Sequence, residues 1–461
     1  MITGTLQEIA RILRGELSGE DRSFLGVSTD SRSLEAGQLF VALTGPNFDA
    51  HDFLPAAAEK GAAGAVVSAA RNGDLPRVRV PDTLRALGAL AAQWRSRFDP
   101  VVVGVTGSAG KTTVKEMIAA ILSRSGPTLV TRGNLNNEIG VPLTLFRMSA
   151  SHQGAVIEMG ANHAGEIGRL ADMARPGIGV ITLAGAAHLE GFGSVEGVAR
   201  AKAELYEALP GDGTAVINAD DCYARLWREI AAPRSIVTFG LGPGADFTAR
   251  DITRAAEGET GTKFRLVCPA GEADVSLGLP GLHNVMNALA AAAAAVSAGA
   301  TLDDVAAGLG TTQTVPGRMQ LCDGVAGCRI IDDTYNANPG SVRAALDYLT
   351  DLEGTPWAIL GDMGELGGQA SRLHREVGEY AKSVGVERLF VLGPLSRMVA
   401  DGFGPGAECF TDVSSLLSAV RPALAGHVNL LVKGSRSMGM ERVVQGLVAT
   451  DEPRVARGGG N

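Results

Sequence analysis

The sequence predicts an α/β protein of three domains, and three observations support this prediction. The chain has 461 residues, too many for one ordinary core at roughly 150 residues per domain. Short apolar runs alternate with helical patterns, as in mostly parallel sheets. Polar stretches interrupt this alternation at 99–100 and 311–318. We expect a small N-terminal α/β domain (1–98), a central P-loop-type domain with a mostly parallel sheet (99–313) and a C-terminal Rossmann-like domain (314–461).

The composition is that of a folded globular protein, with 45% hydrophobic and 20% charged residues. A net charge of −9 argues against broad binding to nucleic acid or anionic membranes. The first 15 residues lack a signal-peptide core, and the alanine-rich run 288–300 is too short and too weakly hydrophobic to span a bilayer. The five cysteines form no CxxC pair, which predicts reduced thiols. We expect a cytoplasmic protein without membrane insertion or nucleic-acid binding.

Each domain has its own succession of expected elements. The first begins with an amphipathic helix near 9–14 and contains strands at 38–43, 63–68 and 77–80 and a helix at 82–97. The central domain has strands at 101–105, 128–131, 155–157, 179–183, 214–217 and 235–239, an antiparallel appendage at 246–279 and a helix at 284–298. The third has strands at 329–331, 357–360, 389–392 and 429–432. Residues 451–461 are expected to form a disordered tail.

The strongest local pattern is Gly-Val-Thr-Gly-Ser-Ala-Gly-Lys-Thr-Thr at 104–113, between a buried strand and a helical pattern. In such a loop the backbone N–H groups bind phosphates, the Lys111 ammonium meets the terminal phosphates, and the Thr112 hydroxyl completes a Mg²⁺ shell. Val105 stands where the usual phosphate loop has its first glycine. A plain glycine-rich turn is the alternative, but the Lys-Thr pair and the flanking elements favour nucleotide binding.

Two further polar residues follow strands of the same expected sheet. Glu158 closes one strand, and His188 follows the next through a short loop. Because α/β sheets bind ligands at the carboxyl ends of their strands, both are candidates to hold Mg²⁺. A solvent-facing glutamate and a structural histidine are the corresponding alternatives.

Lys202 shares an apolar helical stripe with Val198 and Leu205. Its ammonium can reach water past its neighbours, the commoner fate of such a lysine. The functional alternative is a lysine of depressed pKa that takes up CO₂ and becomes an anionic, metal-binding carbamate. Helical spacing does not decide between them.

Four polar groups complete the candidate site. Asn284 and Asn287 share a helix face, although Asn284 could equally cap the helix. Arg318 sits on the linker before the third domain, where it could clamp a phosphate or simply be exposed. The turn 332–339 follows a strand and precedes a helix, with capping as its alternative role. The turn 433–436, Lys-Gly-Ser-Arg, is suited to binding a carboxylate.

Taken together, these segments resemble the Mur ligases, and the resemblance covers nearly the whole chain. Its segments are 28–32 and 39–43 in the first domain, 106–113, 134–142, 158–166, 188–202 and 283–287 in the second, and 316–319, 332–339, 361–367 and 433–436 in the third. The phosphate loop of that family also lacks the first glycine. The similarity is greatest to members that add D-alanyl-D-alanine to UDP-N-acetylmuramoyl-tripeptide through an acyl phosphate, in peptidoglycan precursor synthesis.

The resemblance implies roles for individual residues. The catalytic group would comprise Lys111, Glu158, His188, Lys202 and Arg318. ATP would be bound by Thr106, Gly107, Ser108, Ala109, Gly110, Lys111, Thr112, Thr113, Asn284, Asn287, Arg318 and Asp333. Two Mg²⁺ ions would be held by Thr112, Glu158, His188 and Lys202 as its carbamate. The precursor and the dipeptide would be bound by Thr29, Asp30, Ser31, Arg32, Asn137, Asn336, Asp362, Lys433, Ser435 and Arg436. The partners are then these two substrates, and we expect a monomer.

Three other functions are compatible with parts of this pattern. A sister ligase adds a free diamino acid to UDP-N-acetylmuramoyl-dipeptide, but commonly carries a DNPR-like element that is missing from this sequence. Folylpolyglutamate synthase shares the chemistry and is disfavoured by Asn338-Pro339 and by 433–436. A non-catalytic ATP-binding regulator would need none of Glu158, His188, Lys202 and Arg318.

Overall fold

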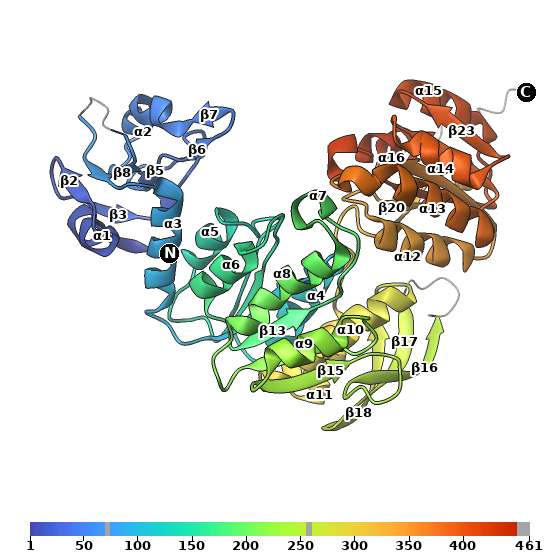
Figure 1. Ribbon diagram of the computed structural model, residues 1–461, viewed down its shortest axis with the longest axis horizontal. Coiled ribbons are helices and arrows are strands. Elements are labelled where there is room, and N and C mark those ends of the chain that lie inside the picture. Colours follow the sequence, from blue (N-terminus) through green and yellow to red (C-terminus); the bar gives the residue numbers. More distant parts are fainter. Residues whose placement is uncertain (70–73, 255–260, 450–461) are drawn as a thin grey trace, which may run out of the picture.

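The computed structural model describes residues 1–69, 74–254 and 261–449. Three sheet-based units follow one another along the chain, with the N-terminal and C-terminal units at opposite ends of the central one (Figure 1). The expected α/β architecture of three domains is confirmed. The tail expected at 451–461 lies outside the described residues.

The N-terminal unit is a five-stranded sheet in the order β2 (Glu16–Ser18), β9 (Arg77–Arg79), β8 (Gly64–Val67), β5 (Leu39–Val41) and β4 (Val27–Ser28). Its helices are α1 (Leu6–Leu13), α2 (Leu54–Glu59) and α3 (Thr83–Arg95). Two small antiparallel pairs complete it, β1 (Thr3–Thr5) with β3 (Ser23–Leu25) and β6 (Thr44–Gly45) with β7 (Phe48–Asp49). The expected helices and strands are present; β2, which pairs antiparallel with β9, was not expected because its three residues are not buried.

The central unit is a six-stranded sheet, and every neighbouring pair of its strands is parallel. The order is β11 (Thr128–Val130), β12 (Gly154–Glu158), β10 (Val101–Thr106), β13 (Ile178–Ile181), β14 (Thr214–Asn218) and β15 (Ser235–Phe239). Its helices are α4 (Lys111–Leu122), α5 (Gly140–Leu145), α6 (Glu166–Ala174), α7 (Leu189–Phe192), α8 (Val195–Glu207), α9 (Ala224–Ala231), α10 (Leu282–Ser297) and α11 (Leu302–Gly310). All six strands expected from the sequence are therefore present.

The appendage expected at 246–279 is a three-stranded antiparallel sheet of β16 (Thr248–Arg254), β17 (Thr262–Cys268) and β18 (Gly271–Leu277). Its apolar face shares one core with α4 and the alanine-rich helix α10. Small alanine side chains let that helix approach the sheet closely, and Ala288 to Ala295 are all buried. Within the described part of the chain, no helix is both long and apolar enough to cross a membrane.

The C-terminal unit is a six-stranded sheet in the order β19 (Gln320–Asp323), β20 (Arg329–Asp333), β24 (Val428–Lys433), β21 (Thr355–Gly361), β22 (Arg388–Leu392) and β23 (Ala407–Phe410). Helices α12 (Pro339–Thr350), α13 (Ala370–Ser383), α14 (Ser396–Phe403), α15 (Val413–Val420) and α16 (Glu441–Leu447) accompany it. The four expected strands form its parallel centre. The edge strands β19, which is antiparallel, and β23 were not expected, since neither contains a fully buried run.

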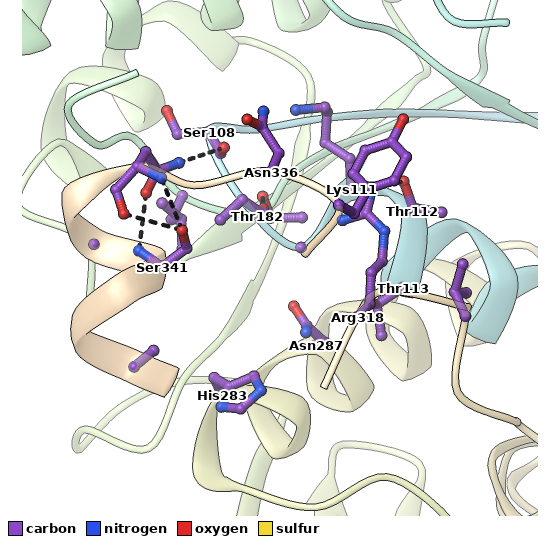
Figure 2. Close-up of a pocket in the computed structure, with 18 of the residues that line it drawn as sticks. Ser108, Lys111, Thr112, Thr113, Thr182, His283, Asn287, Arg318, Asn336 and Ser341 are labelled. Atoms are coloured by element: carbon purple, nitrogen blue, oxygen red, sulfur yellow. Dashed lines mark hydrogen bonds between the residues drawn. The ribbon is translucent and has the colours of Figure 1, made fainter. Parts of the chain in front are cut away.

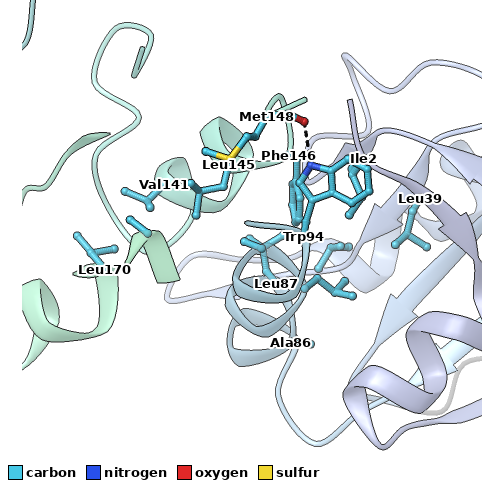
Figure 3. Close-up of a cluster of buried hydrophobic side chains, with 14 of the residues drawn as sticks. Ile2, Leu39, Ala86, Leu87, Trp94, Val141, Leu145, Phe146, Met148 and Leu170 are labelled. Atoms are coloured by element: carbon cyan, nitrogen blue, oxygen red, sulfur yellow. Dashed lines mark hydrogen bonds between the residues drawn. The ribbon is translucent and has the colours of Figure 1, made fainter. Parts of the chain in front are cut away.

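The N-terminal and central units share one hydrophobic core. Trp94 and Leu87 of α3 pack against Val141, Leu145 and other side chains around α5 (Figure 3). The indole N–H of Trp94 donates to the Met148 carbonyl at 3.1 Å, which leaves no unpaired polar atom on this buried ring. The two units are therefore joined by a packed interface in addition to the chain connection.

Candidate active site

The loop between β10 and α4 has the geometry of a phosphate-binding turn. Gly107 has φ of +151° and Gly110 has φ of +80°, conformations that favour glycine. A Cβ at Gly107 would lie 1.8 Å from the Thr182 hydroxyl oxygen, and one at Gly110 would lie 2.5 Å from the Asn287 amide oxygen. Both glycines are thus required by backbone conformation and by close neighbours. Val105, which replaces the usual first glycine, is fully buried within β10, so a side chain is accommodated there.

Lys111 is the first residue of α4, and its ammonium donates a hydrogen bond to the Gly107 carbonyl at 2.7 Å. Burial lowers the pKa of this lysine, the Glu158 carboxylate opposes that shift, and the Arg318 guanidinium adds to it. The ammonium therefore lies over the loop at the N-terminus of α4, where anions are favoured.

Glu158 is the last residue of β12 and is only 2% exposed, so the solvent-facing alternative is wrong. Its carboxylate accepts hydrogen bonds from the Thr112 hydroxyl at 3.0 Å and from the Asn136 amide at 2.8 Å. A buried carboxylate with so few partners keeps free lone pairs for a cation. Asn136 was missed in the sequence analysis; its position in the Asn-rich turn before α5 was the available signal.

Lys202 lies on the buried side of α8 and is 2% exposed, so its ammonium does not reach bulk water as the commoner alternative required. Within the described residues, the ammonium has no hydrogen bond and no carboxylate within ion-pair distance. Burial first, and then the positive charge of Lys111, lower its pKa well below the ordinary value. Its amine is therefore biased toward the neutral, nucleophilic form.

His188 precedes α7 and has a left-handed conformation with φ of +53°. Its Nδ1 lies 2.5 Å from a carboxylate oxygen of Glu365, which belongs to the C-terminal unit. This contact lowers the pKa of the Glu365 carboxyl. Glu365 lies in the segment 361–367 that carries the resemblance but was not itself a site candidate, because a contact between two units cannot be read from either segment.

Arg318 is half-buried rather than freely exposed. Its guanidinium donates to the Thr112 hydroxyl at 3.0 Å and lies 4.1 Å from the centre of the Tyr335 ring. Its Nε is buried and has no hydrogen-bond partner in the described part of the chain. A buried, unpaired N–H beside the phosphate loop is an available donor for an anion.

The turn after β20 contributes a second group of charges. The Lys433 ammonium, 3% exposed, lies 2.5 Å from an Asp333 carboxylate oxygen and also donates to the Asn336 carbonyl at 2.9 Å. Asn338 caps the N-terminus of α12, so the capping alternative given for this turn is confirmed. Its side-chain amide also donates to the Ser108 carbonyl at 3.2 Å. The turn is therefore tied directly to the phosphate loop of the central unit.

Asn284 and Asn287 do share a face of α10, and the Asn287 amide donates to the Asn284 side-chain oxygen at 3.1 Å. The capping alternative for Asn284 is wrong, because the helix is capped at Gly281 and Asn284 is buried within its first turn. Its amide instead donates to the Pro280 carbonyl at 2.7 Å.

Most of these groups line one cavity of about 580 Å³ between the central and C-terminal units (Figure 2). Figure 2 shows Lys111, Thr112 and Arg318 grouped together, with Ser108 and Ser341 away from them. The sequence candidates that line the cavity are Ser108, Ala109, Gly110, Lys111, Thr112, Thr113, Asn137, Glu158, His188, Asn284, Asn287, Arg318, Asp333, Asn336 and Lys433. Fifteen side chains and loop positions predicted from separate segments thus meet in one place.

Other candidates lie outside the cavity lining. Thr106 is the buried last residue of β10, and Gly107 is the first residue of the loop that follows it. Lys202 lies close enough to Lys111 for the charge of Lys111 to lower the pKa of Lys202. The Asp362 carboxylate is occupied by the backbone N–H and hydroxyl of Ser396, at 2.6 and 2.7 Å. Ser435 is buried nearby, whereas Arg436 is exposed.

The N-terminal candidates Thr29, Asp30, Ser31 and Arg32 lie in a different unit from the cavity. Arg32 forms a bidentate ion pair with Asp30, and the bonds from Arg32 lower the pKa of Asp30 to about 2. This segment is therefore a polar turn of the N-terminal unit, well away from the phosphate loop.

The residues present suit a Mg²⁺ ion bound together with phosphates. No group of three His, Cys, Asp or Glu side chains gathers as a metal cage in the parts of the chain that the structure describes. Mg²⁺ commonly takes one or two carboxylates and completes its shell with waters and substrate phosphates. The buried Glu158 carboxylate, the Thr112 hydroxyl and the adjacent phosphate loop match that donor set.

The fold and site now define the class of protein: the chain belongs to the Mur ligase family. Three family models match it in succession, namely the Mur ligase family catalytic domain at 24–95, the Mur ligase middle domain at 105–295 and the Mur ligase glutamate ligase domain at 317–436.

Within this family, the chain is similar over nearly its whole length to relatives that carry the same name, MurF. The chain is 45% identical to the UDP-N-acetylmuramoyl-tripeptide–D-alanyl-D-alanine ligase of Escherichia coli (strain K12), covering 97% of this chain and 99% of the relative. A crystal structure of MurF from Acinetobacter baumannii superimposes with a TM-score of 0.91 at 35% identity, over 96% and 98% of the two chains. MurF from Thermotoga maritima in complex with ADP gives a TM-score of 0.82 at 29% identity, over 91% and 96%.

Proposed function

We propose that the chain is an ATP-dependent ligase that joins UDP-N-acetylmuramoyl-tripeptide to D-alanyl-D-alanine, forming ADP and phosphate, in the cytoplasmic steps of peptidoglycan precursor synthesis. The observation that supports it best is the meeting of the phosphate loop and Glu158 with Arg318, Asp333 and Lys433 in one cavity. The names of the relatives supply the substrates.

The nucleotide would be bound in the cavity by the loop 106–113. Its phosphates would meet the loop N–H groups, the Lys111 ammonium and the Arg318 guanidinium, while Asn284, Asn287 and Asp333 would contact the rest of the nucleotide. Two Mg²⁺ ions would be held by Thr112, Glu158, His188 and carbamylated Lys202, and would neutralise charge on the transferred phosphoryl group.

The chemistry requires activation of a carboxylate, whose oxygen is a poor leaving group. The γ-phosphoryl group of ATP moves to this oxygen, and Lys111 and Arg318 stabilise the charge that develops. The dipeptide amine then attacks the acyl carbon, loses its proton, and phosphate leaves. Closure of the two units over the cavity would keep water away from the acyl phosphate, which water would otherwise hydrolyse.

Each proposed domain has one task in this scheme. Domain 1–98 would bind the UDP end through Thr29, Asp30, Ser31 and Arg32, with Asn137 beside the neighbouring part of the precursor. Domain 99–313 would bind ATP. Domain 314–461 would bind the dipeptide near Asn336, Asp362, Lys433, Ser435 and Arg436. We expect the enzyme to act as a monomer, since every proposed group comes from one chain.

The test is ADP release from MgATP with UDP-N-acetylmuramoyl-tripeptide, with and without D-alanyl-D-alanine. We expect release only when both substrates are present. Lys111→Ala should abolish release without lowering the melting temperature, since it removes one of several neighbouring cations. Release only with UDP-N-acetylmuramoyl-dipeptide and a free diamino acid would instead identify the sister ligase. Absence of any substrate-dependent release would favour a non-catalytic regulator.

A further inference from the structure

His188, a candidate metal ligand of the central unit, contacts Glu365 of the C-terminal unit. The His188 Nδ1 and the Glu365 Oε2 are 2.5 Å apart, and the Glu190 backbone N–H donates to the Glu365 carbonyl at 3.2 Å. Both His188 and Glu365 have left-handed backbones, with φ of +53° and +61°. Such conformations are costly for residues other than glycine and concentrate at functional sites.

The loop that carries Glu365 is held firmly by its own unit. The Met363 backbone N–H donates to the ring of the buried His374 at 2.9 Å, and Leu366 on the other side is 2% exposed. The Asp362 carbonyl accepts from the Ser435 backbone N–H at 2.9 Å. Glu365 therefore reaches His188 from a rigid support, while its own side chain stays 54% exposed.

The contact determines which nitrogen of His188 remains available. The buried Nδ1 has no hydrogen bond of ordinary geometry within the described residues, and the Glu365 carboxylate oxygen at 2.5 Å is its ion-pair partner. A carboxylate this close favours the tautomer that carries its proton on Nδ1. The ring then keeps a lone pair on Nε2 when it is neutral. Nε2 has no hydrogen-bond partner in residues 1–69, 74–254 and 261–449, and the ring lines the cavity. A carboxylate on one ring nitrogen orients a histidine and makes the other nitrogen a better metal ligand.

We propose that Glu365 is a positioning residue that orients His188 as a metal ligand, so that docking of the C-terminal unit completes the metal site. The proposal rests on the proposed function, in which His188 holds Mg²⁺. Because linkage is reciprocal, the bound metal also favours the docked arrangement by the same factor. Glu365 itself touches neither substrate nor metal in this scheme.

The experiment measures Mn²⁺ binding to the full-length protein with saturating ADP, by electron paramagnetic resonance. Glu365→Ala should raise the Mn²⁺ dissociation constant about tenfold to a hundredfold. Glu365→Gln should raise it less, because its amide oxygen can still accept from Nδ1–H. Glu408→Ala is the matched control, since Glu408 pairs with Arg388 at 2.6 Å on the same unit, away from the cavity, and should leave binding unchanged.

A double-mutant cycle separates this role from a structural one. In a His188→Ala background, Glu365→Ala should have no further effect on Mn²⁺ binding, because the two residues act through one interaction. Unchanged or tighter binding in Glu365→Ala, or an equal loss in the His188→Ala background, would overturn the proposal while leaving the ligase assignment intact. A wild-type protein with no Mn²⁺–ADP binding would overturn both proposals.

Discussion

Lys202 is a buried lysine with no partner among the residues that the structure describes, and a charge there would cost free energy unless the amine is neutral or chemically modified. The depressed pKa favours the neutral amine, the form that reacts with CO₂ to give a carbamate. A carbamate would replace an unpaired cation by an anion beside Lys111 and so relieve the repulsion between the two lysines.

We predict that wild-type turnover falls in CO₂-depleted buffer and recovers when bicarbonate is added. Lys202→Ala should be at least about a hundredfold less active and should not respond to bicarbonate, because a proposed metal ligand is lost. Lys382→Ala, which changes an exposed lysine of α13, should behave like wild type. Bicarbonate-independent turnover of the wild type would exclude a required carbamate.

His374 links the pH dependence of stability to the loop that carries Glu365. Burial lowers the pKa of His374 below its ordinary value of 6.5, and its Nε2 accepts the Met363 N–H. Since the folded pKa is depressed, its contribution to stability is fully present above pH 6.5 and is lost as the pH falls through the folded pKa.

We therefore predict that His374→Leu lowers the free energy of unfolding at pH 7.5 by about 1–3 kcal/mol, the cost of an unpaired buried N–H. The difference in unfolding free energy between the variant and the wild type should be smaller at pH 5.5. At that pH His374 of the wild type takes up a proton on unfolding, which destabilises the wild type but not the leucine variant. Urea denaturation at the two pH values measures both quantities. If the difference in unfolding free energy between wild type and His374→Leu grew on acidification, His374 would not be a buried neutral ring that accepts through Nε2.

At the scale of elements, the β10–α4 turn depends on backbone geometry more than on side chains. We predict that Gly107→Ala destabilises the protein by about 1–3 kcal/mol and weakens ADP binding, since the new Cβ is both strained and too close to Thr182. Gly177→Ala is the control, because no atom of the described residues lies within 4 Å of its Cβ position and its φ is outside the left-handed region. Denaturation and ADP titration of both variants test this, and equal behaviour would refute it.

At the scale of the molecule, the hydrophobic core around Trp94 holds the N-terminal and central units together. Trp94→Ala should lower the free energy of unfolding by about 3–5 kcal/mol. Leu25→Ala, at a residue 57% exposed, should change it by less than about 0.5 kcal/mol. Chemical denaturation compares the two. A small effect of Trp94→Ala would mean that the units are joined only by the chain.

The joint with the C-terminal unit combines an apolar cluster, which Leu189 and Val198 of the central unit enter, with polar contacts. Several of its contacts are polar and lie around the cavity, among them Arg318 to Thr112, Asn338 to Ser108 and His188 to Glu365. Polar contacts exchange readily with water and ligands, whereas a packed apolar core does not. Substrate-dependent changes are therefore expected among the polar contacts around the cavity.

Hydrophobic periodicity and turn chemistry were enough to predict the three-domain α/β architecture, the six parallel central strands and the phosphate loop. These features follow from neighbours in the sequence and from the rule that parallel strands end at a common edge. The strands β2, β19 and β23 escaped prediction because they lie at sheet edges or have few buried residues.

Tertiary structure decided the partners of each polar group, and these partners separate the alternatives that the sequence left open. Thr112 and Arg318 are 206 positions apart and yet form a hydrogen bond, and Lys202 is buried rather than snorkelling. Burial, pairing and the Glu365–His188 contact are properties of how the units pack. Local patterns carry no information about them, because the residues concerned meet only in the folded chain.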